Sequence, residues 1–148
     1  MQFVLRSYKE LSVDELYNVL KLRCAIFVIE QNCNYQDMDD KDQDSFHLLG
    51  YEGKQLVAYA RILPKGLSYE EVSIGRVVVD KNFRGKSSGK TLMNEAIDQA
   101  KKLFDADEIV ISAQCYLEKF YGDLGFKTEG ESYLEDDIPH IKMRLILL

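Results

Sequence analysis

The sequence GRVVVDKNFRGKSSGKT, residues 75–91, decides the fold because it joins a strand, a basic loop and a helix. The β-branched run 77–79 is typical of a buried strand, and apolar residues recur at helical spacing from residue 92 onward. Two glycines and two serines in the loop 82–89 let the backbone approach a ligand closely. The first amides of a helix have no partner within the helix and carry partial positive charge. The stretch therefore predicts an anion-binding site.

The composition indicates one globular domain, which we expect to cover residues 1–148, because 46% hydrophobic content is enough to build a core. The formal net charge of -6 argues against a nucleic-acid binder, whose surface would be basic. No window approaches the ~18 to 20 apolar residues of a membrane span, and the N-terminus does not resemble an export signal. Three cysteines without C-x-x-C spacing indicate neither disulfides nor zinc. We therefore predict a cytoplasmic protein with no metal, no membrane contact and no nucleic-acid partner.

The spacing of apolar residues predicts the element order strand, helix, hairpin, strand, helix, strand, helix, strand, strand. The strands are expected at residues 2–8, 46–51, 56–63, 72–80, 109–113, 126–128 and 138–147, and the helices are expected to begin near residues 12, 88 and 114. A solvated loop is the expectation for the acidic run 37–44, which could also attract a cationic amine. The apolar run 145–148 could pair strands in a homodimer.

Two nucleotide-binding patterns fail at the loop. Ser88-Gly89-Lys90-Thr91 ends like a Walker A loop, but the first glycine of that motif would have to stand at the position of Arg84. The apolar strand at 109–113 also lacks the aspartate that would hold magnesium. Only two glycines stand where a dinucleotide fingerprint needs three. The spacing of the glycines thus excludes both a Walker A loop and a dinucleotide-binding loop.

A third pattern extends over nearly the whole chain. Residues 84–89, RGKSSG, resemble the [QR]-x-x-G-x-[GA] acetyl-coenzyme A loop of the GNAT superfamily of N-acetyltransferases, and residues 120–126, FYGDLGF, resemble its F-Y-x-x-x-G-F signature. A helix and a strand separate the two motifs, as in that family. Segments that resemble its ElaA-like branch are residues 22–31, 35–37, 73–79, 112–114 and 135–140. One departure is Ser87, which occupies the position of the middle glycine. We expect coenzyme A binding to persist there, provided that the serine needs no positive φ.

The resemblance implies an α/β fold with a mixed, mostly antiparallel sheet of six to seven strands. About four helices are expected to flank the sheet, and its central strand pair is expected to splay. The implied function is transfer of an acetyl group from acetyl-coenzyme A to a primary amine of a small molecule or peptide, by direct attack in a ternary complex. The alternative is a domain that binds acyl-coenzyme A as a sensor or assembly module without turnover. The implied cofactor-binding residues are Val77, Val78, Val79, Arg84, Gly85, Lys86, Ser87, Ser88, Gly89, Lys90 and Thr91.

Acetyl transfer also needs proton management. By resemblance, Tyr121 is expected to protonate the departing thiolate, and a neutral phenol can do so. His140 is the favoured general base, while His47 lies inside an expected strand and is interpreted as structural. Glu71 is a weaker candidate for the base. The residues expected at the acceptor side are Arg23, Glu30, Gln31, Tyr35 and Gln114. Arg23 stands among apolar neighbours, so we expect it to meet a carboxylate of the protein or of the ligand.

Overall fold

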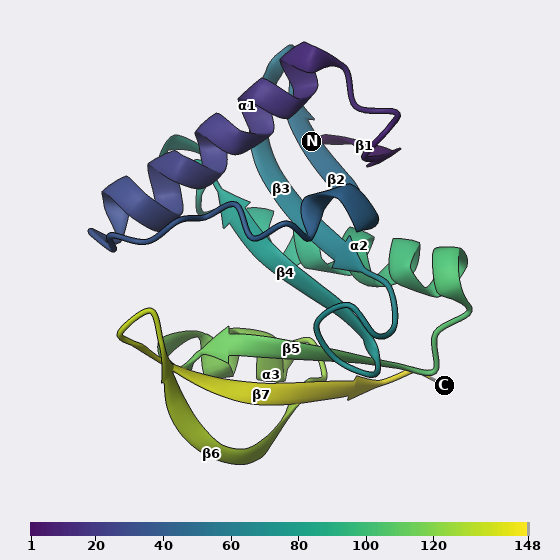
Figure 1. Cartoon of the computed structure of the whole chain (residues 1–148), viewed down its shortest axis with the longest axis vertical. Helices are drawn as coiled ribbons and strands as arrows, with labels where there is room; N and C mark the ends of the chain where they lie inside the picture. Colours follow the sequence, from purple (N-terminus) through teal and green to yellow (C-terminus); the bar gives the residue numbers. More distant parts are fainter. Residues whose placement is uncertain (148) are drawn as a thin grey trace.

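The computed structural model describes residues 1–147, and its elements follow the predicted order. Seven strands form one sheet in the order β1-β2-β3-β4-β5-β7-β6 (Figure 1). The strands are β1 (Gln2–Ser7), β2 (Phe46–Glu52), β3 (Gln55–Leu63), β4 (Val72–Val79), β5 (Glu108–Gln114), β6 (Lys127–Glu135) and β7 (Ile138–Ile146). Only the β4–β5 pair is parallel among these strands. The prediction of a mixed, mostly antiparallel sheet is confirmed.

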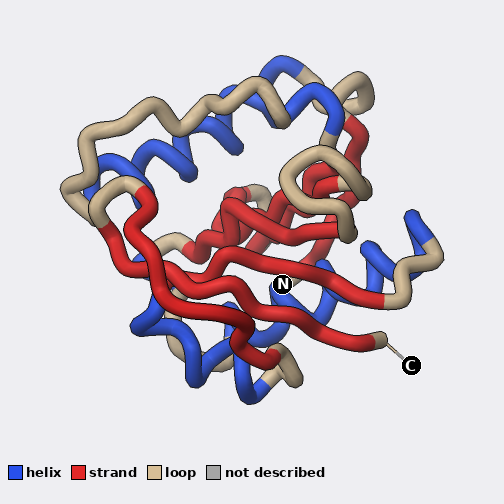
Figure 2. The backbone as a smooth tube through the Cα atoms, turned by 60° about the horizontal axis from the view of Figure 1, so that its bottom comes forward, coloured by secondary structure: helices blue, strands red, loops and turns tan. Residues whose placement is uncertain are grey.

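Helices cover both faces of the sheet, as Figure 2 shows. They are α1 (Val13–Arg23), which continues as the π-helix η1 (Cys24–Glu30), α2 (Ser88–Phe104) and α3 (Glu118–Asp123). The side chains of neighbouring strand residues point to opposite faces, so Leu48 packs in the core with α2 and α3, while Leu49 packs with α1. Ser12 caps α1 in a capping box with Glu15, as its sequence predicts. No helix within residues 1–147 is long and apolar enough to cross a membrane.

The sheet opens between β4 and β5. These strands pair only at Val72 with Ile109 and at Ser73 with Val110, and then they diverge (Figure 1). A bulge in β4 accompanies the opening: Ala60 of β3 faces two residues, and Arg76 has a φ of 50°. The second half of β4 therefore pairs with β3 along one edge, while its other edge faces the opening.

Arginines from three elements surround the acidic run. Arg23 of α1 is fully buried, and its Nε and Nη1 lie 2.8 Å from carboxylate oxygens of Asp37 and Asp42 respectively. Arg61 of β3 binds Asp42 at 2.9 Å and Asp39 at 2.7 Å. The complete ion network consists of three arginines and three aspartates: Arg23, Arg61, Arg76, Asp37, Asp39 and Asp42. The interpretation of this run as a solvated loop is wrong, because three partly or fully buried guanidinium groups need counter-charges.

One prediction about the C-terminal hairpin is also corrected. β6 continues to Glu135 and is not the short strand 126–128, because an edge strand exposed along its length needs no apolar alternation. Asp136 and Asp137, with φ of 51° and 62°, form the two-residue turn to β7. β7 lies between β5 and β6 and pairs with β5 over residues 140–146 and with β6 between residues 138 and 144, so Leu145 and Ile146 of the predicted pairing run are paired with β5 on one edge. Leu148 of the predicted pairing run lies outside the described residues.

Candidate active site

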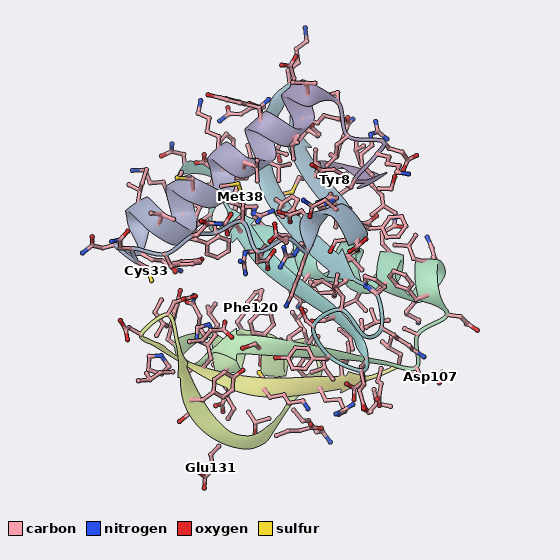
Figure 3. The ribbon with its side chains drawn as sticks, in the orientation of Figure 1. Tyr8, Cys33, Met38, Asp107, Phe120 and Glu131 are labelled. Carbon is pink, nitrogen blue, oxygen red and sulfur yellow. The ribbon has the colours of Figure 1, made fainter. Side chains whose placement is uncertain are left out.

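A cavity of about 750 Å³ lies where β4 and β5 diverge. Its wall is formed by the open edge of β4, the start of α2, the end of η1, α3 and the β6–β7 turn. Figure 3 shows the labelled Phe120 side chain between the two halves of the sheet, and this ring lines the cavity. The splaying of one strand pair thus creates a site to which distant segments of the sequence contribute.

The loop after β4 has an unusual backbone. Gly85, Lys86 and Ser87 all have positive φ, at 82°, 52° and 60°. The condition on which we expected coenzyme A binding to persist is therefore not met, because Ser87 occupies the left-handed region that glycine adopts without strain. Ser87 stands at the N-cap of α2, yet its side chain caps no amide.

The start of α2 suits an anion. The amide of Thr91 donates to the carbonyl oxygen of Ser87 at 2.9 Å, which is the first hydrogen bond of helical spacing. The amides of Gly89 and Lys90 precede that bond, so no earlier turn of the helix can accept from them. With Lys86 and Lys90 beside them, these amides fit a phosphate group. Arg84 adds a guanidinium at the mouth of the same loop, where it lines the cavity.

Val77, Val78 and Val79 all line the cavity. Val78 and Val79 pair with β3 on one edge, opposite Tyr59 and Ala58, while β5 has already diverged from their other edge. A strand edge of this kind can accept an extended, amide-bearing ligand as an added strand. The geometry therefore fits the role that the resemblance implies for these three valines.

Tyr121 projects from α3 into the cavity wall and is 8% exposed. Its ring packs edge-to-face against Phe120 and Phe126, with centroid distances of 5.0 and 5.9 Å. Burial raises the pKa of Tyr121 to about 12. The phenol is therefore protonated at neutral pH and can donate a proton.

His140 lies near the start of β7, is 7% exposed and also lines the cavity. Its Nδ1 is 2.7 Å from the carbonyl oxygen of Ile138, which can only accept, so Nδ1 carries a proton. Nε2 is then the nitrogen that can take up a proton. It lies 3.4 Å from Oε2 of Glu135.

Four predicted acceptor-side residues come together at the cavity: Glu30, Gln31, Tyr35 and Gln114. Gln114 bonds Gln31 at 3.4 Å and stands opposite His140 in the β5–β7 register. Its Oε1 is buried without a hydrogen-bond partner in residues 1–147, so it can accept from a ligand. Burial raises the pKa of Tyr35 to about 12.

Arg23 is the exception among the predicted acceptor residues. Its side chain is buried in the ion network and is not part of the cavity wall, so it meets protein carboxylates only. Its effect on an acceptor would be indirect, through Asp37 and Arg76. His47 is likewise buried, with Tyr59 Oη at 2.6 Å and the Asp42 carbonyl at 2.9 Å, which fits the structural role predicted for it.

Sequence reasoning missed part of the cavity wall. Glu135 and Asp136 of the β6–β7 turn, Tyr69 before β4 and Ser112 of β5 all line it. The Asp-Asp pair at the turn was a usable signal, because a two-residue hairpin favours aspartate at positive φ. Tyr69 and Ser112 carry no such signal, since only the folded sheet brings them to the site.

Residues 6–147 match the family described as an acetyltransferase (GNAT) domain. The chain belongs to the GNAT acetyltransferase family. It is 45% identical to protein ElaA of Escherichia coli (strain K12) over 138 residues, which cover 92% of this chain and 90% of ElaA.

Two crystal structures share the fold. That of Escherichia coli ElaA matches with a TM-score of 0.90 at 43% identity, over 98% of this chain and 99% of ElaA. An acyl-CoA N-acyltransferase from Pseudomonas aeruginosa matches with a TM-score of 0.89 at 38% identity, over 98% of this chain and 99% of that one. Family membership supports acyl transfer from an acyl-coenzyme A as the chemistry of this fold.

Proposed function

We propose that the protein transfers an acetyl group from acetyl-coenzyme A to a primary amine of a small molecule or peptide, by direct attack in a ternary complex. The observation that carries this proposal is one continuous cavity with the open edge of β4 and the start of α2 in its wall, together with Tyr121 and His140. A thioester held along β4 and an amine at His140 would meet inside it. The acceptor could be small or could be the end of a peptide, because the cavity opens to solvent.

In the proposed binding mode, the pantetheine arm lies beside β4 as an added strand and pairs with its open edge at Val77, Val78 and Val79. The phosphates lie against the first amides of α2, with Arg84, Lys86 and Lys90 supplying positive charge. A backbone N–H of β4 would polarise the thioester carbonyl, an interaction worth on the order of 3 kcal/mol in well-studied oxyanion holes. Holding the thioester and the amine next to each other in this orientation supplies most of the rate acceleration that their reaction needs.

The proton steps follow from the side chains. An ammonium gives one proton to Nε2 of His140, directly or through water, and the neutral amine attacks the thioester carbon. The C–N bond forms, the C–S bond breaks and the second amine proton goes to solvent, because Nε2 of His140 already holds the first. Tyr121 donates its phenolic proton to the departing thiolate. Its raised pKa, about 12, keeps the phenol protonated at neutral pH before the transfer.

A screen of thiol release from acetyl-coenzyme A across a panel of primary amines tests the function. We expect release that depends on at least one amine, and we expect coenzyme A to raise the melting temperature, since a ligand of the native state stabilises it. A protein that binds coenzyme A but releases no thiol with any amine would be the acyl-coenzyme A sensor or assembly module instead. No thermal shift at millimolar coenzyme A would count against both functions.

Three further assignments are proposed from the chain itself: its location, its single domain and the strands that would pair in a dimer. The cysteines Cys24, Cys33 and Cys115 are free thiols, which suits the reducing cytoplasm. One continuous sheet over the described chain supports a single domain for residues 1–148. If a homodimer forms through strand pairing, β1 or β6 would mediate it, because these are the edge strands.

A further inference from the structure

One ion pair joins the two substrate-binding walls of the cavity. Nη2 of Arg84, in the phosphate loop, lies 2.8 Å from Oε2 and 3.1 Å from Oε1 of Glu30, at the end of η1. Nε of Arg84 donates to the carbonyl oxygen of Val79 at 3.0 Å, which fixes the guanidinium beside the open edge of β4. Both side chains line the cavity. A residue of the acceptor wall thus neutralises a residue of the cofactor wall.

Glu30 stands where helix electrostatics disfavour it. The C-terminal end of a helical segment carries partial negative charge, so a carboxylate there gains nothing from the helix. The next residue, Gln31, bonds Gln114, which is paired in register with His140. Glu30 is therefore part of the wall that surrounds the proposed acceptor position, and Arg84 is its counter-charge.

This pair is also the one that a ligand can break. The other two cavity-wall arginines, Arg61 and Arg76, belong to the balanced network with Asp37, Asp39 and Asp42, and their side chains are only 3% and 22% exposed. The side chains of Arg84 and Glu30 are 43% and 35% exposed. A phosphate that reaches Arg84 would offer it a stronger, doubly bonded partner than one exposed carboxylate.

We propose that Glu30 and Arg84 couple the two substrates. Resting on the proposed function, the inference is that coenzyme A phosphates take Arg84 away from Glu30, which leaves the Glu30 carboxylate as a binding group for a cationic acceptor. Without a cation, the released carboxylate is uncompensated beside the phosphates. Cofactor and cationic acceptor therefore bind with positive cooperativity, and anionic acceptors are disfavoured.

The size of the effect follows from the exposure of the pair. Exposed ion pairs are worth about 0.2 to 1 kcal/mol, which corresponds to a factor of about 1.4 to 5 in a dissociation constant. Removing the carboxylate frees Arg84, so Glu30→Gln should bind coenzyme A about 1.4- to 5-fold more tightly than the wild type. Because coupling is reciprocal, a cation should tighten coenzyme A binding in the wild type within the same range.

The test is isothermal titration of coenzyme A, which carries no acyl group to transfer, into four proteins of matched melting behaviour: wild type, Glu30→Gln, Arg84→Gln and the double variant. We expect tighter binding for Glu30→Gln and no effect of the same change when Arg84 is already glutamine. Glu118→Gln is the matched control, because it removes the same charge from an exposed position on α3 outside the cavity wall. It should leave the dissociation constant unchanged.

Three results would overturn the coupling. Glu30→Gln could bind coenzyme A equally well or more weakly, which would mean that Glu30 orients Arg84 for the phosphate. It could bind more tightly in the Arg84→Gln background too, which would reveal general repulsion by the carboxylate. The third is that the wild type binds coenzyme A no more tightly in the presence of 1-butylamine than in the presence of butyrate. Absence of coenzyme A binding by the wild type would instead refute the proposed function itself.

Discussion

Replacing Asp42 by asparagine should destabilise the protein more than any other change in the acidic run 37–44. Its Oδ1 accepts from Nη1 of Arg23 at 2.8 Å and from Nη1 of Arg61 at 2.9 Å, and its side chain is 8% exposed. The asparagine side chain would keep the shape of the aspartate but would leave an excess positive charge between two buried guanidinium groups. Removing one partner of a buried ion pair costs about 3 to 5 kcal/mol, which is a large part of the stability of an ordinary domain.

For a chain of this size, that loss corresponds to a fall in melting temperature of roughly 6 to 20 °C. Thermal melts and urea titrations at pH 7 would measure it. Asp44→Asn is the matched control, since Asp44 is exposed in the same segment and its change should stay within ~0.5 kcal/mol. If both variants melt alike, the ion network contributes no net stability and our account of the acidic run is wrong.

The wild type and Asp42→Asn also provide a test of how stability depends on pH. Burial alone would raise the pKa of Asp42, but hydrogen bonds and charge from Arg23 and Arg61 outweigh it and hold the pKa below the usual range. A lowered folded-state pKa stabilises the protein fully above the unfolded value of about 3.9, and this stability is lost as pH falls toward the folded value. The gap in unfolding free energy between wild type and Asp42→Asn should therefore be constant from pH 7 to 5 and shrink below about 3.9. A gap that shrinks between pH 7 and 5 would contradict this assignment.

Three other variants test the site and the far end of the sheet. Tyr121→Phe should leave the coenzyme A dissociation constant nearly unchanged and lower turnover at least ~10-fold in the thiol assay, because a lost proton transfer typically costs ~10²- to 10⁴-fold; unchanged turnover would reduce Tyr121 to packing. Ser87→Gly should be roughly 0 to 1 kcal/mol more stable in urea, because the relief of positive-φ strain is at least as large as the cost of the added unfolded-state entropy. The variant should bind coenzyme A at least as well as the wild type. Weaker binding would show that the serine side chain contacts the ligand. Arg144→Met should lose about 1 to 3 kcal/mol, since Arg144 pairs with three partly exposed carboxylates, and the loss should shrink in 0.5 M NaCl; no loss would show that these pairs are energetically idle.

The sequence predicted those parts of the fold that depend on local periodicity. The helix α2 has apolar residues on one face, such as Leu92, Ala96 and Ala100, and all three are buried. β5 contains the short apolar run predicted as a strand at residues 109–113, and Ile109, Val110 and Ile111 are all buried. β6 was predicted too short because an exposed edge strand does not show the alternation on which such predictions depend.

The site was predictable where one segment supplies both the residues and the geometry. The loop from Arg84 to Gly89 needs no distant partner, so its motif sufficed to predict a place at the cavity, and Arg84, Gly85 and Gly89 line the cavity wall. The environment of Arg23 could be predicted only in part. Its apolar surroundings required a counter-charge, but the sequence spacing could not show that Asp37 and Asp42 supply it. The positive φ of Ser87 was also hidden, because serine is usually not found in that conformation.

Initial-rate kinetics test the central claim, direct transfer in one ternary cavity, most directly. With an amine found in the screen, thiol release is measured while both acetyl-coenzyme A and the amine are varied. Because the open edge of β4 and His140 line the same cavity, we expect double-reciprocal lines that intersect and no thiol released without amine. Parallel lines, together with a burst of thiol before amine is added, would indicate an acetylated enzyme intermediate and would contradict direct attack.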